Sequence, residues 1–77
     1  MPPLTITADW DEEAQVWVAA SKDILGLVTE ADTLEELRFK LIDLVPELIA
    51  ENGLAPGADP SSPIDIVARQ RLVTQAA

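Results

Sequence analysis

The sequence contains no cysteine, no histidine and no tyrosine. The usual ligand sets for zinc, haem and iron-sulfur clusters are therefore missing, together with the commonest general base. Disulfide bonds are excluded too, so a domain of 77 residues must be stabilised by a small core and by self-association. The absence of cysteine fits a reducing compartment, and we expect a cytoplasmic protein without cofactors.

Basic residues and long apolar runs are also scarce. Five Lys and Arg against fourteen Asp and Glu give a formal net charge of -9, which is the wrong sign for binding a phosphate backbone. We expect no direct nucleic-acid binding, whereas a basic protein partner would be attracted. Apolar runs fall far short of the about 20 residues of a membrane helix. Residues 1–4 lack the basic segment and apolar core of a secretory signal.

The first 31 residues read as three short strands. Residues 4–10 alternate apolar and polar side chains, which is the pattern of a half-buried strand. A polar break over residues 11–14 is followed by residues 15–21, which are rich in Val and Trp and are predicted to return as the second arm of a hairpin. Residues 22–26 turn the chain, and residues 27–31 form a third strand that completes an antiparallel meander.

An amphipathic helix is predicted over residues 34–51. Either Asp32 or Thr33 can cap its first amides, and the acidic residues that follow favour a helix start. Apolar residues recur at helical spacing at positions 34, 37, 41, 44, 45 and 48. Gly53 supplies a helix end. Pro46 has no amide and its ring collides with the carbonyl four residues earlier, so we expect a kink there or two helices that meet.

The remainder of the chain is predicted to be a loop and a last strand. Residues 54–63 contain three prolines and a glycine, which is typical of a surface loop. Residues 64–74 resume a strand-like pattern. The elements together predict one α+β domain over residues 1–77 in the order β-β-β-α-β.

The predicted second strand is apolar on both sides. Residues 16–20 read Val-Trp-Val-Ala-Ala, and alternate residues of a strand face opposite ways. With a four-residue hairpin loop Trp17 lies under the helix while Val16, Val18 and Ala20 face outward; a three-residue loop exchanges the two sets. Either register leaves an apolar face that another chain would cover. The alternative is that the C-terminal segment or the proline-rich loop folds over it.

Three further residues are candidates for protein contacts. Phe39 falls outside the leucine stripe of the helix, among acidic residues, although a single exposed Phe is also ordinary surface. Arg69 and Arg71 lie on a possible edge strand, where charges usually prevent unwanted pairing. The candidate interface residues are Val16, Trp17, Val18, Ala20, Phe39, Arg69 and Arg71.

The one dense acidic cluster consists of Asp9, Asp11, Glu12 and Glu13. Paired carboxylates can hold Mg²⁺ for phosphoryl chemistry, so a metal-dependent nuclease is one alternative. Such sites gather acids from separate strands, whereas these four crowd one hairpin tip, where carboxylates are well solvated. Phosphate-binding loops and nucleophile elbows are absent from the sequence. We therefore expect no catalytic residue, no metal site and no enzymatic activity.

A spaced set of residues runs from the turn after the second predicted strand into the first turn of the helix. Its members are Asp23, Gly26, Thr29, Asp32, Thr33, Glu35 and Glu36. In this order and spacing they resemble the N-terminal domain of HicB antitoxins, in which the corresponding run reads D-L-P-G-C-x-T-x-G-D-T-x-E-E. Leu25, Leu27 and Ala31 replace the proline, a cysteine and a glycine of that run, which indicates a divergent HicB-like branch of short, functionally unassigned bacterial proteins.

The resemblance implies a truncated ribonuclease-H-like fold in which the final strand lies beside the first. It also implies a protein that neutralises a small basic ribonuclease toxin and self-associates, and we expect a stand-alone form without the C-terminal DNA-binding domain of many HicB proteins. The sequence thus predicts a non-catalytic protein-binding domain that forms a dimer or tetramer and acts as an antitoxin-like inhibitor. The alternative is a homo-oligomeric assembly module without a toxin target.

Overall fold

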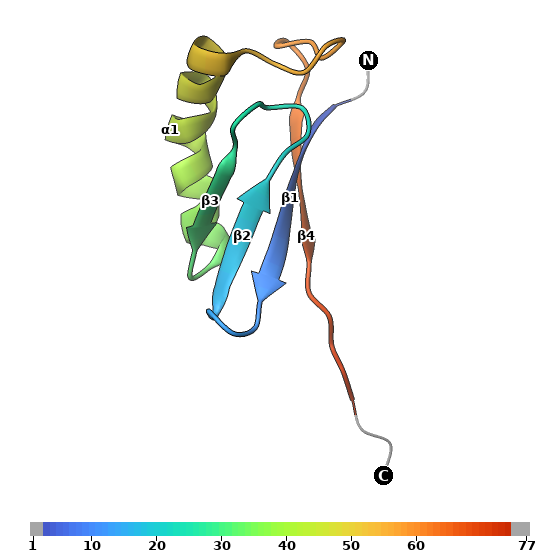
Figure 1. Ribbon diagram of the computed structural model, residues 1–77. Helices are drawn as coiled ribbons and strands as arrows, with labels where there is room; N and C mark the ends of the chain where they lie inside the picture. Colours follow the sequence, from blue (N-terminus) through green and yellow to red (C-terminus); the bar gives the residue numbers. More distant parts are fainter. Residues whose placement is uncertain (1–2, 75–77) are drawn as a thin grey trace.

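The computed structural model describes residues 3–74, which form one four-stranded sheet and one helix (Figure 1). The elements are β1 (Leu4–Asp11), β2 (Val16–Ala20), β3 (Val28–Ala31), α1 (Leu34–Asn52) and β4 (Ile64–Arg69). The sheet order is β3-β2-β1-β4, with β4 parallel to β1 and the other pairs antiparallel. The expected α+β class, the order of the elements and the final strand beside the first are confirmed.

The hairpin between β1 and β2 settles which face each side chain occupies. Trp10 pairs with Trp17 across the two strands, and the connecting loop is the four residues 12–15. The two indole rings lie on the helix face, with their centroids 5.3 Å apart. Of the two registers considered, the four-residue loop is therefore the one present, and Val16 and Val18 are on the outer face of the sheet.

The core lies between the sheet and α1, which packs next to β2 and β3. Its buried side chains are Leu4, Ile6, Ala8, Ala19, Ile24, Leu27, Ala31, Leu37, Leu41 and Val45. Burial of these apolar groups is the main force that holds α1 on the sheet. Because α1 lies over β2 and β3, it covers less of the sheet near β4.

Both ends of α1 are capped by residues that the sequence predicted for this role. Thr33 is the N-cap, and its hydroxyl accepts a hydrogen bond from the Glu36 backbone N–H at 3.1 Å. At the other end Gly53 has a φ of 74°, and its N–H donates to the Ile49 carbonyl at 3.0 Å. No helix within residues 3–74 is both long and apolar enough to cross a membrane.

Pro46 lies inside α1 without dividing it. Of the two expectations for this residue, a kink or two separate helices, the second is wrong because α1 continues from Leu34 to Asn52. Pro46 removes only its own N–H from the helical ladder. The carbonyl that loses this donor belongs to Ile42, which is exposed, so water can hydrate the free oxygen.

Side chains complete the hydrogen bonds of β1 where its neighbour ends. β2 stops at Ala20, opposite Thr7, and the backbone of Thr5 lies beyond that end. The Asp23 carboxylate accepts from the Thr5 N–H at 2.7 Å, and the Ser21 hydroxyl donates to the Thr5 carbonyl at 2.6 Å. These two side chains replace the missing strand partner, which would otherwise leave polar groups of β1 unpaired.

Gly26 is required by its backbone conformation and by its neighbour. Its φ is 81°, and a Cβ added there would lie 2.8 Å from the Asn52 Nδ2 atom, which donates to the Leu25 carbonyl at 3.2 Å. This contact ties the turn before β3 to the end of α1. Asp23, Gly26 and Thr33, three residues of the HicB-like pattern, therefore each have a structural role.

The proline-rich loop over residues 54–63 crosses the end of the sheet and leads into β4 (Figure 1). Leu54 packs against the core and forms a bridge with Ile24. Within the loop the Ser61 N–H and hydroxyl both donate to the Asp59 carboxylate, which lowers the pKa of that group. The loop is thus an ordered connection that fixes where β4 begins.

We predict that Gly26→Ala destabilises the fold more than Gly57→Ala does. Both glycines have positive φ, so each substitution carries the conformational penalty of about 1 kcal/mol. Nothing lies within 4 Å of a Cβ at Gly57, whereas at Gly26 the new methyl group displaces Asn52 and breaks its hydrogen bond, at a further cost of about 1 kcal/mol. Chemical denaturation measures the two free energies of unfolding. Equal losses would contradict this account of Gly26.

Candidate protein-interaction surface

Strand β4 is exposed on both of its faces. All of its residues, Ile64–Arg69, are exposed, and Ile64 and Ile66 on the helix face retain 40% and 41% of their accessible surface. Val67 on the outer face is exposed as well. Parallel strands are normally covered on both faces. An apolar parallel strand without cover is therefore a surface that another chain can bury.

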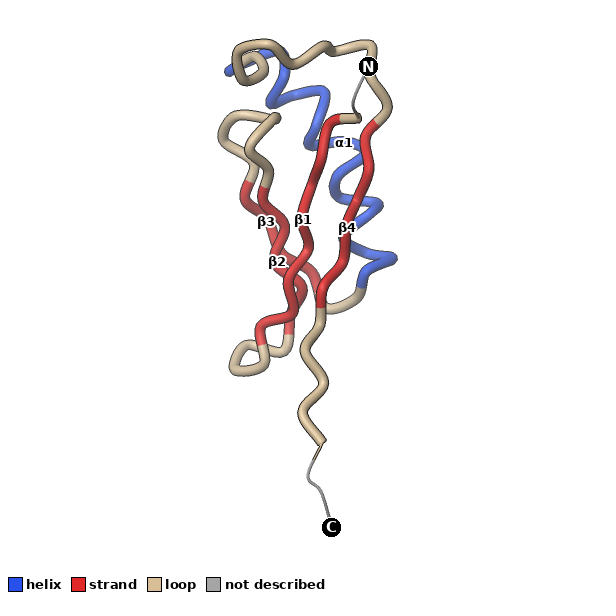
Figure 2. The backbone as a smooth tube through the Cα atoms, turned by 90° about the vertical axis from the view of Figure 1, so that its right-hand side faces the viewer, coloured by secondary structure: helices blue, strands red, loops and turns tan. Residues whose placement is uncertain are grey.

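The edge of β4 that faces away from β1 is also open. β4 is the end strand of the sheet and pairs with β1 alone (Figure 2). The Pro63 carbonyl accepts from the Leu4 N–H at 2.8 Å, so Pro63 points its backbone groups toward β1. Because these groups alternate along a strand, Ile64, Ile66 and Ala68 point their N–H and C=O groups toward the open edge.

An apolar groove separates α1 from β4. It has a volume of about 340 Å³, and we call it the α1–β4 groove. Its lining residues are Ile6, Arg38, Leu41, Ile42, Val45, Pro46, Ile64 and Ile66. The groove exists because α1 lies over β2 and β3 and leaves a gap beside the last strand.

Phe39 belongs to the helix surface beside this groove. It is 59% exposed, which agrees with the expectation that it lies outside the buried stripe. At about 100° per residue, Phe39, Ile42 and Pro46 follow one line along α1, and the last two line the groove. The apolar surface therefore continues from the exposed side of α1 across the groove to β4.

The chain after β4 extends away from the body of the molecule (Figures 1 and 2). The predicted strand over residues 64–74 is too long, because pairing with β1 ends at Arg69 and residues 70–74 have no neighbouring strand. We call residues 70–74 the C-terminal extension. Leu72 in this extension is 85% exposed. The radius of gyration is 14.1 Å, against about 11 Å for a compact domain of this length.

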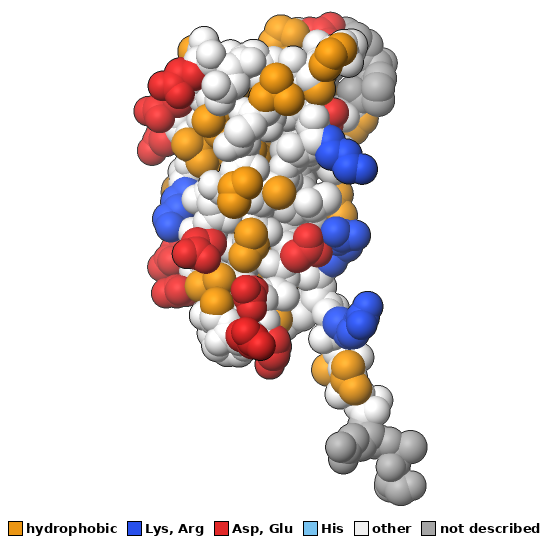
Figure 3. Space-filling view, viewed as in Figure 1, with side chains coloured by type: hydrophobic (Ala, Val, Ile, Leu, Met, Phe, Trp, Pro, Cys, Tyr) orange, Lys and Arg blue, Asp and Glu red, His pale blue; other side chains and the backbone are white. Residues whose placement is uncertain are grey.

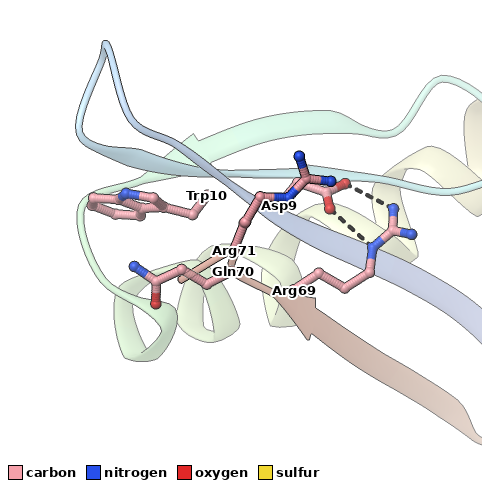
Figure 4. A pocket seen from close by; sticks show the side chains of 5 residues that line it. All are labelled: Asp9, Trp10, Arg69, Gln70 and Arg71. Atoms are coloured by element: carbon pink, nitrogen blue, oxygen red, sulfur yellow. Dashed lines mark hydrogen bonds and ion pairs between the residues drawn. The ribbon is translucent and has the colours of Figure 1, made fainter. Parts of the chain in front are cut away.

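Arg69 and Arg71 lie together where β4 passes into the C-terminal extension. Arg69 makes a two-pronged contact with Asp9, with Nε to Oδ1 at 3.0 Å and Nη2 to Oδ2 at 3.2 Å (Figure 4). Both side chains of this pair are more than half exposed. Asp9, Arg69 and Arg71 line a shallow hollow with Trp10 and Gln70. No ion pair joins Arg71 to another residue of the described chain.

The outer face of the sheet is open, as the double-sided pattern of β2 predicted. Val16 and Val18 are half-buried and Ala20 is exposed, as is Val28 on the neighbouring β3. In Figure 3 the hydrophobic side chains in view are separated by polar and backbone atoms, without a single continuous patch. Trp17, also a candidate, packs against the core on the opposite face.

The acidic residues of the hairpin serve the hairpin itself. The Asp11 carboxylate accepts the Glu13 and Ala14 N–H groups at 3.0 and 3.2 Å, and the Glu12 carboxylate accepts the Trp10 indole N–H at 2.7 Å. Between residues 3 and 74 there is no group of three acidic side chains arranged to hold a metal ion. These carboxylates therefore have a structural explanation in the turn.

The sequence did not identify Ile42, Ile64 and Ile66 as surface residues. The pattern placed Ile64 and Ile66 on one side of a strand, which is normally the side that packs on a core. A usable signal was present: Val67 makes β4 apolar on both sides, as in β2, and a single helix cannot cover the whole sheet. The lateral position of α1 decides which strand remains uncovered.

We predict that the Asp9–Arg69 pair contributes little to stability. Exposed ion pairs are worth about 0 to 1 kcal/mol because water screens the charges and ordering the side chains costs entropy. Asp9→Asn, which keeps the size of the side chain, is expected to lower the free energy of unfolding by less than about 1 kcal/mol. Chemical denaturation at low and high salt is the measurement. A larger loss would show that the pair holds β4 on β1.

Comparison with known proteins identifies the family of this chain. The fold is similar to the crystal structure of hypothetical protein TTHA1013 from the extremely thermophilic bacterium Thermus thermophilus, with 44% sequence identity and a TM-score of 0.69. The similarity covers 97% of this chain and 100% of that one. Comparison with curated proteins gives no match. Residues 3–76 match the model of a domain of unknown function, DUF1902, and the chain therefore belongs to the DUF1902 family.

Proposed function

We propose that this domain works by binding other protein chains rather than by catalysis, as an HicB-like, antitoxin-like inhibitor of a small basic ribonuclease that also self-associates. The observation that carries the proposal is β4, a parallel strand that is exposed on both faces and open at its edge. Its backbone offers a row of unpaired donors and acceptors, which is the feature that extended protein segments recognise when they add a strand to a sheet.

The α1–β4 groove favours a protein partner over a small ligand. The groove is lined by aliphatic side chains, with Arg38 as its one charged group. Small-molecule sites usually enclose most of their ligand and contain several placed polar groups. An open apolar strip beside a strand edge instead suits a chain that pairs with the strand and inserts alternate side chains into the groove.

The charge of the domain supports a basic partner. Glu35, Asp43 and Glu47 are exposed on α1, on the side that also presents Phe39. The chain has a formal net charge of -9, so long-range attraction would speed its encounter with a basic protein. An aromatic anchor surrounded by charges of one sign is a common arrangement at protein interfaces, because the aromatic group provides affinity and the charges provide selectivity.

The test is capture of partners from the native host by three forms of the chain. Each carries an affinity tag at the N-terminus, which keeps the C-terminal extension free. We predict that the wild-type chain captures a short basic protein, that Phe39→Glu reduces its capture at least tenfold by replacing the apolar anchor beside the groove with a charge, and that Val28→Glu leaves capture unchanged. Val28 is a matched control because it is exposed on the outer face of the sheet.

The captured protein is then assayed for ribonuclease activity alone and with the added chain. Inhibition by the wild-type chain, weakened by Phe39→Glu, supports the inhibitor role. If Val28→Glu abolishes capture and Phe39→Glu does not, the binding site lies on the outer face of the sheet. Absence of any basic partner would contradict the inhibitor role and favour the assembly module.

A further inference from the structure

We infer that β4 and the start of the C-terminal extension, residues 64–72, pair with the same residues of a second copy of this chain in antiparallel orientation, with the two-fold axis at Ala68. The inference rests on the proposed function, because it assigns one occupant to the protein-binding surface described above. This segment is complementary to itself in its backbone, its apolar side chains and its charges.

The backbone of β4 permits this pairing. Ile64, Ile66 and Ala68 direct their N–H and C=O groups to the open edge, and in an extended chain the same alternation would include Gln70 and Leu72. Antiparallel pairing about Ala68 places each even-numbered residue opposite another even-numbered residue. The backbone N–H and C=O groups of the two paired residues then point toward each other, which is the condition for a continuous ladder of hydrogen bonds.

The side chains on the helix face also match. In this register Leu72 of each copy lies opposite Ile64 of the other, beside the α1–β4 groove. Leu72 is 85% exposed in the single chain, and the groove is apolar and open. The Leu72 side chain of each copy would therefore be buried beside the groove of the other. Ala68 meets its own equivalent on the axis, where a small side chain avoids crowding.

The charges on the outer face follow the same symmetry. Asp65 of each copy lies opposite Arg71 of the other, which gives two pairs of opposite charge across the new ladder. Arg71 has no ion pair among residues 3–74 and is therefore available for this contact. Arg69, already bound to Asp9, lies opposite Val67 and meets no like charge.

The two neighbouring registers also satisfy the backbone condition and are less favourable. Pairing centred on Val67 places Leu72 opposite the proline-rich loop and leaves the extension largely unpaired. Pairing centred on Arg69 brings the two Arg69 side chains directly opposite each other, and like charges in this position are destabilising. The register about Ala68 combines opposite charges, apolar pairs and an unhindered axis.

The resulting dimer joins two four-stranded sheets into one of eight strands. A two-fold axis perpendicular to the sheet keeps both copies of α1 on the same face. The open edge of β4 disappears in each copy, and residues 70–72 acquire the neighbouring strand that they lack in the single chain. What remains at the edges of the sheet is β3, a strand of four residues whose Glu30 carbonyl accepts a hydrogen bond from Lys40.

Charge reversal tests both the dimer and its register. We expect the full chain to be dimeric by sedimentation at about 1 to 100 µM, and Asp65→Arg or Arg71→Asp alone to weaken the dimer at least about tenfold, because each creates two like-charge pairs. The double variant, with both changes, restores affinity to within about threefold of wild type. The matched control, Asp65→Arg with Arg69→Asp, gives no rescue.

A proline at the axis tests the backbone pairing. Ala68→Pro removes an N–H that points to the open edge and makes no bond to β1, so the variant is expected to keep its circular dichroism spectrum and to sediment as a monomer. Its thermal unfolding is measured at a dilution at which the wild-type chain is monomeric. A dimer that survives both Ala68→Pro and single charge reversal would overturn the inference.

The outcomes also separate this inference from the proposed function. A wild-type chain that is monomeric up to about 100 µM yet captures a basic partner overturns the β4 dimer and leaves the inhibitor role standing. A dimer with the swapped-charge rescue that captures no partner supports the inference and contradicts the inhibitor. Rescue by the Asp65→Arg with Arg69→Asp variant assigns the register about Val67 and overturns the one about Ala68.

Discussion

One helix covers only part of a four-stranded sheet, and the rest of the structure follows from where that helix lies. The core joins α1 to β1, β2 and β3, so these strands bury their apolar sides. β4 is held by the backbone ladder to β1 and by few other contacts, which leaves Ile64 and Ile66 partly exposed. Burial of apolar surface normally stabilises a strand. An apolar strand that no helix covers is therefore a site that another chain can bury.

Three of the residues that resemble the HicB pattern have a direct role in the fold. Asp23 completes the hydrogen bonds of β1, Gly26 lets the turn approach α1, and Thr33 caps the helix. Each of these three positions is constrained by the backbone geometry of this fold. The proposed contacts over residues 64–72 lie outside the pattern. The proposed dimer contact and these fold-determining residues thus lie in different parts of the chain, and likeness in fold does not transfer a function.

The two proposed partners are compatible because they would use different parts of one apolar surface. A second copy would occupy the open edge of β4 and the near side of the α1–β4 groove. The exposed side of α1, with Phe39 and its acidic neighbours, would stay accessible to a basic protein. Mixed charges such as Asp65 and Arg71 suit a self-complementary contact, whereas a surface of one sign suits a partner of the opposite sign. The distribution of charge over the domain would therefore separate the two proposed contacts.

Local patterns in the sequence determined most of this fold. The alternation of residues 4–10, the cap at Thr33 and the stop at Gly53 each depend on neighbouring residues, so the strands and the helix were predictable. Only the tertiary structure decided the four-residue hairpin register, the end of β4 at Arg69 and the position of α1 over β2 and β3. These depend on contacts between residues far apart in the chain. The sequence predicted an uncovered apolar surface on β2, whereas the more continuous uncovered surface is on β4. Periodicity shows which side of a strand is apolar but not which strand the helix covers.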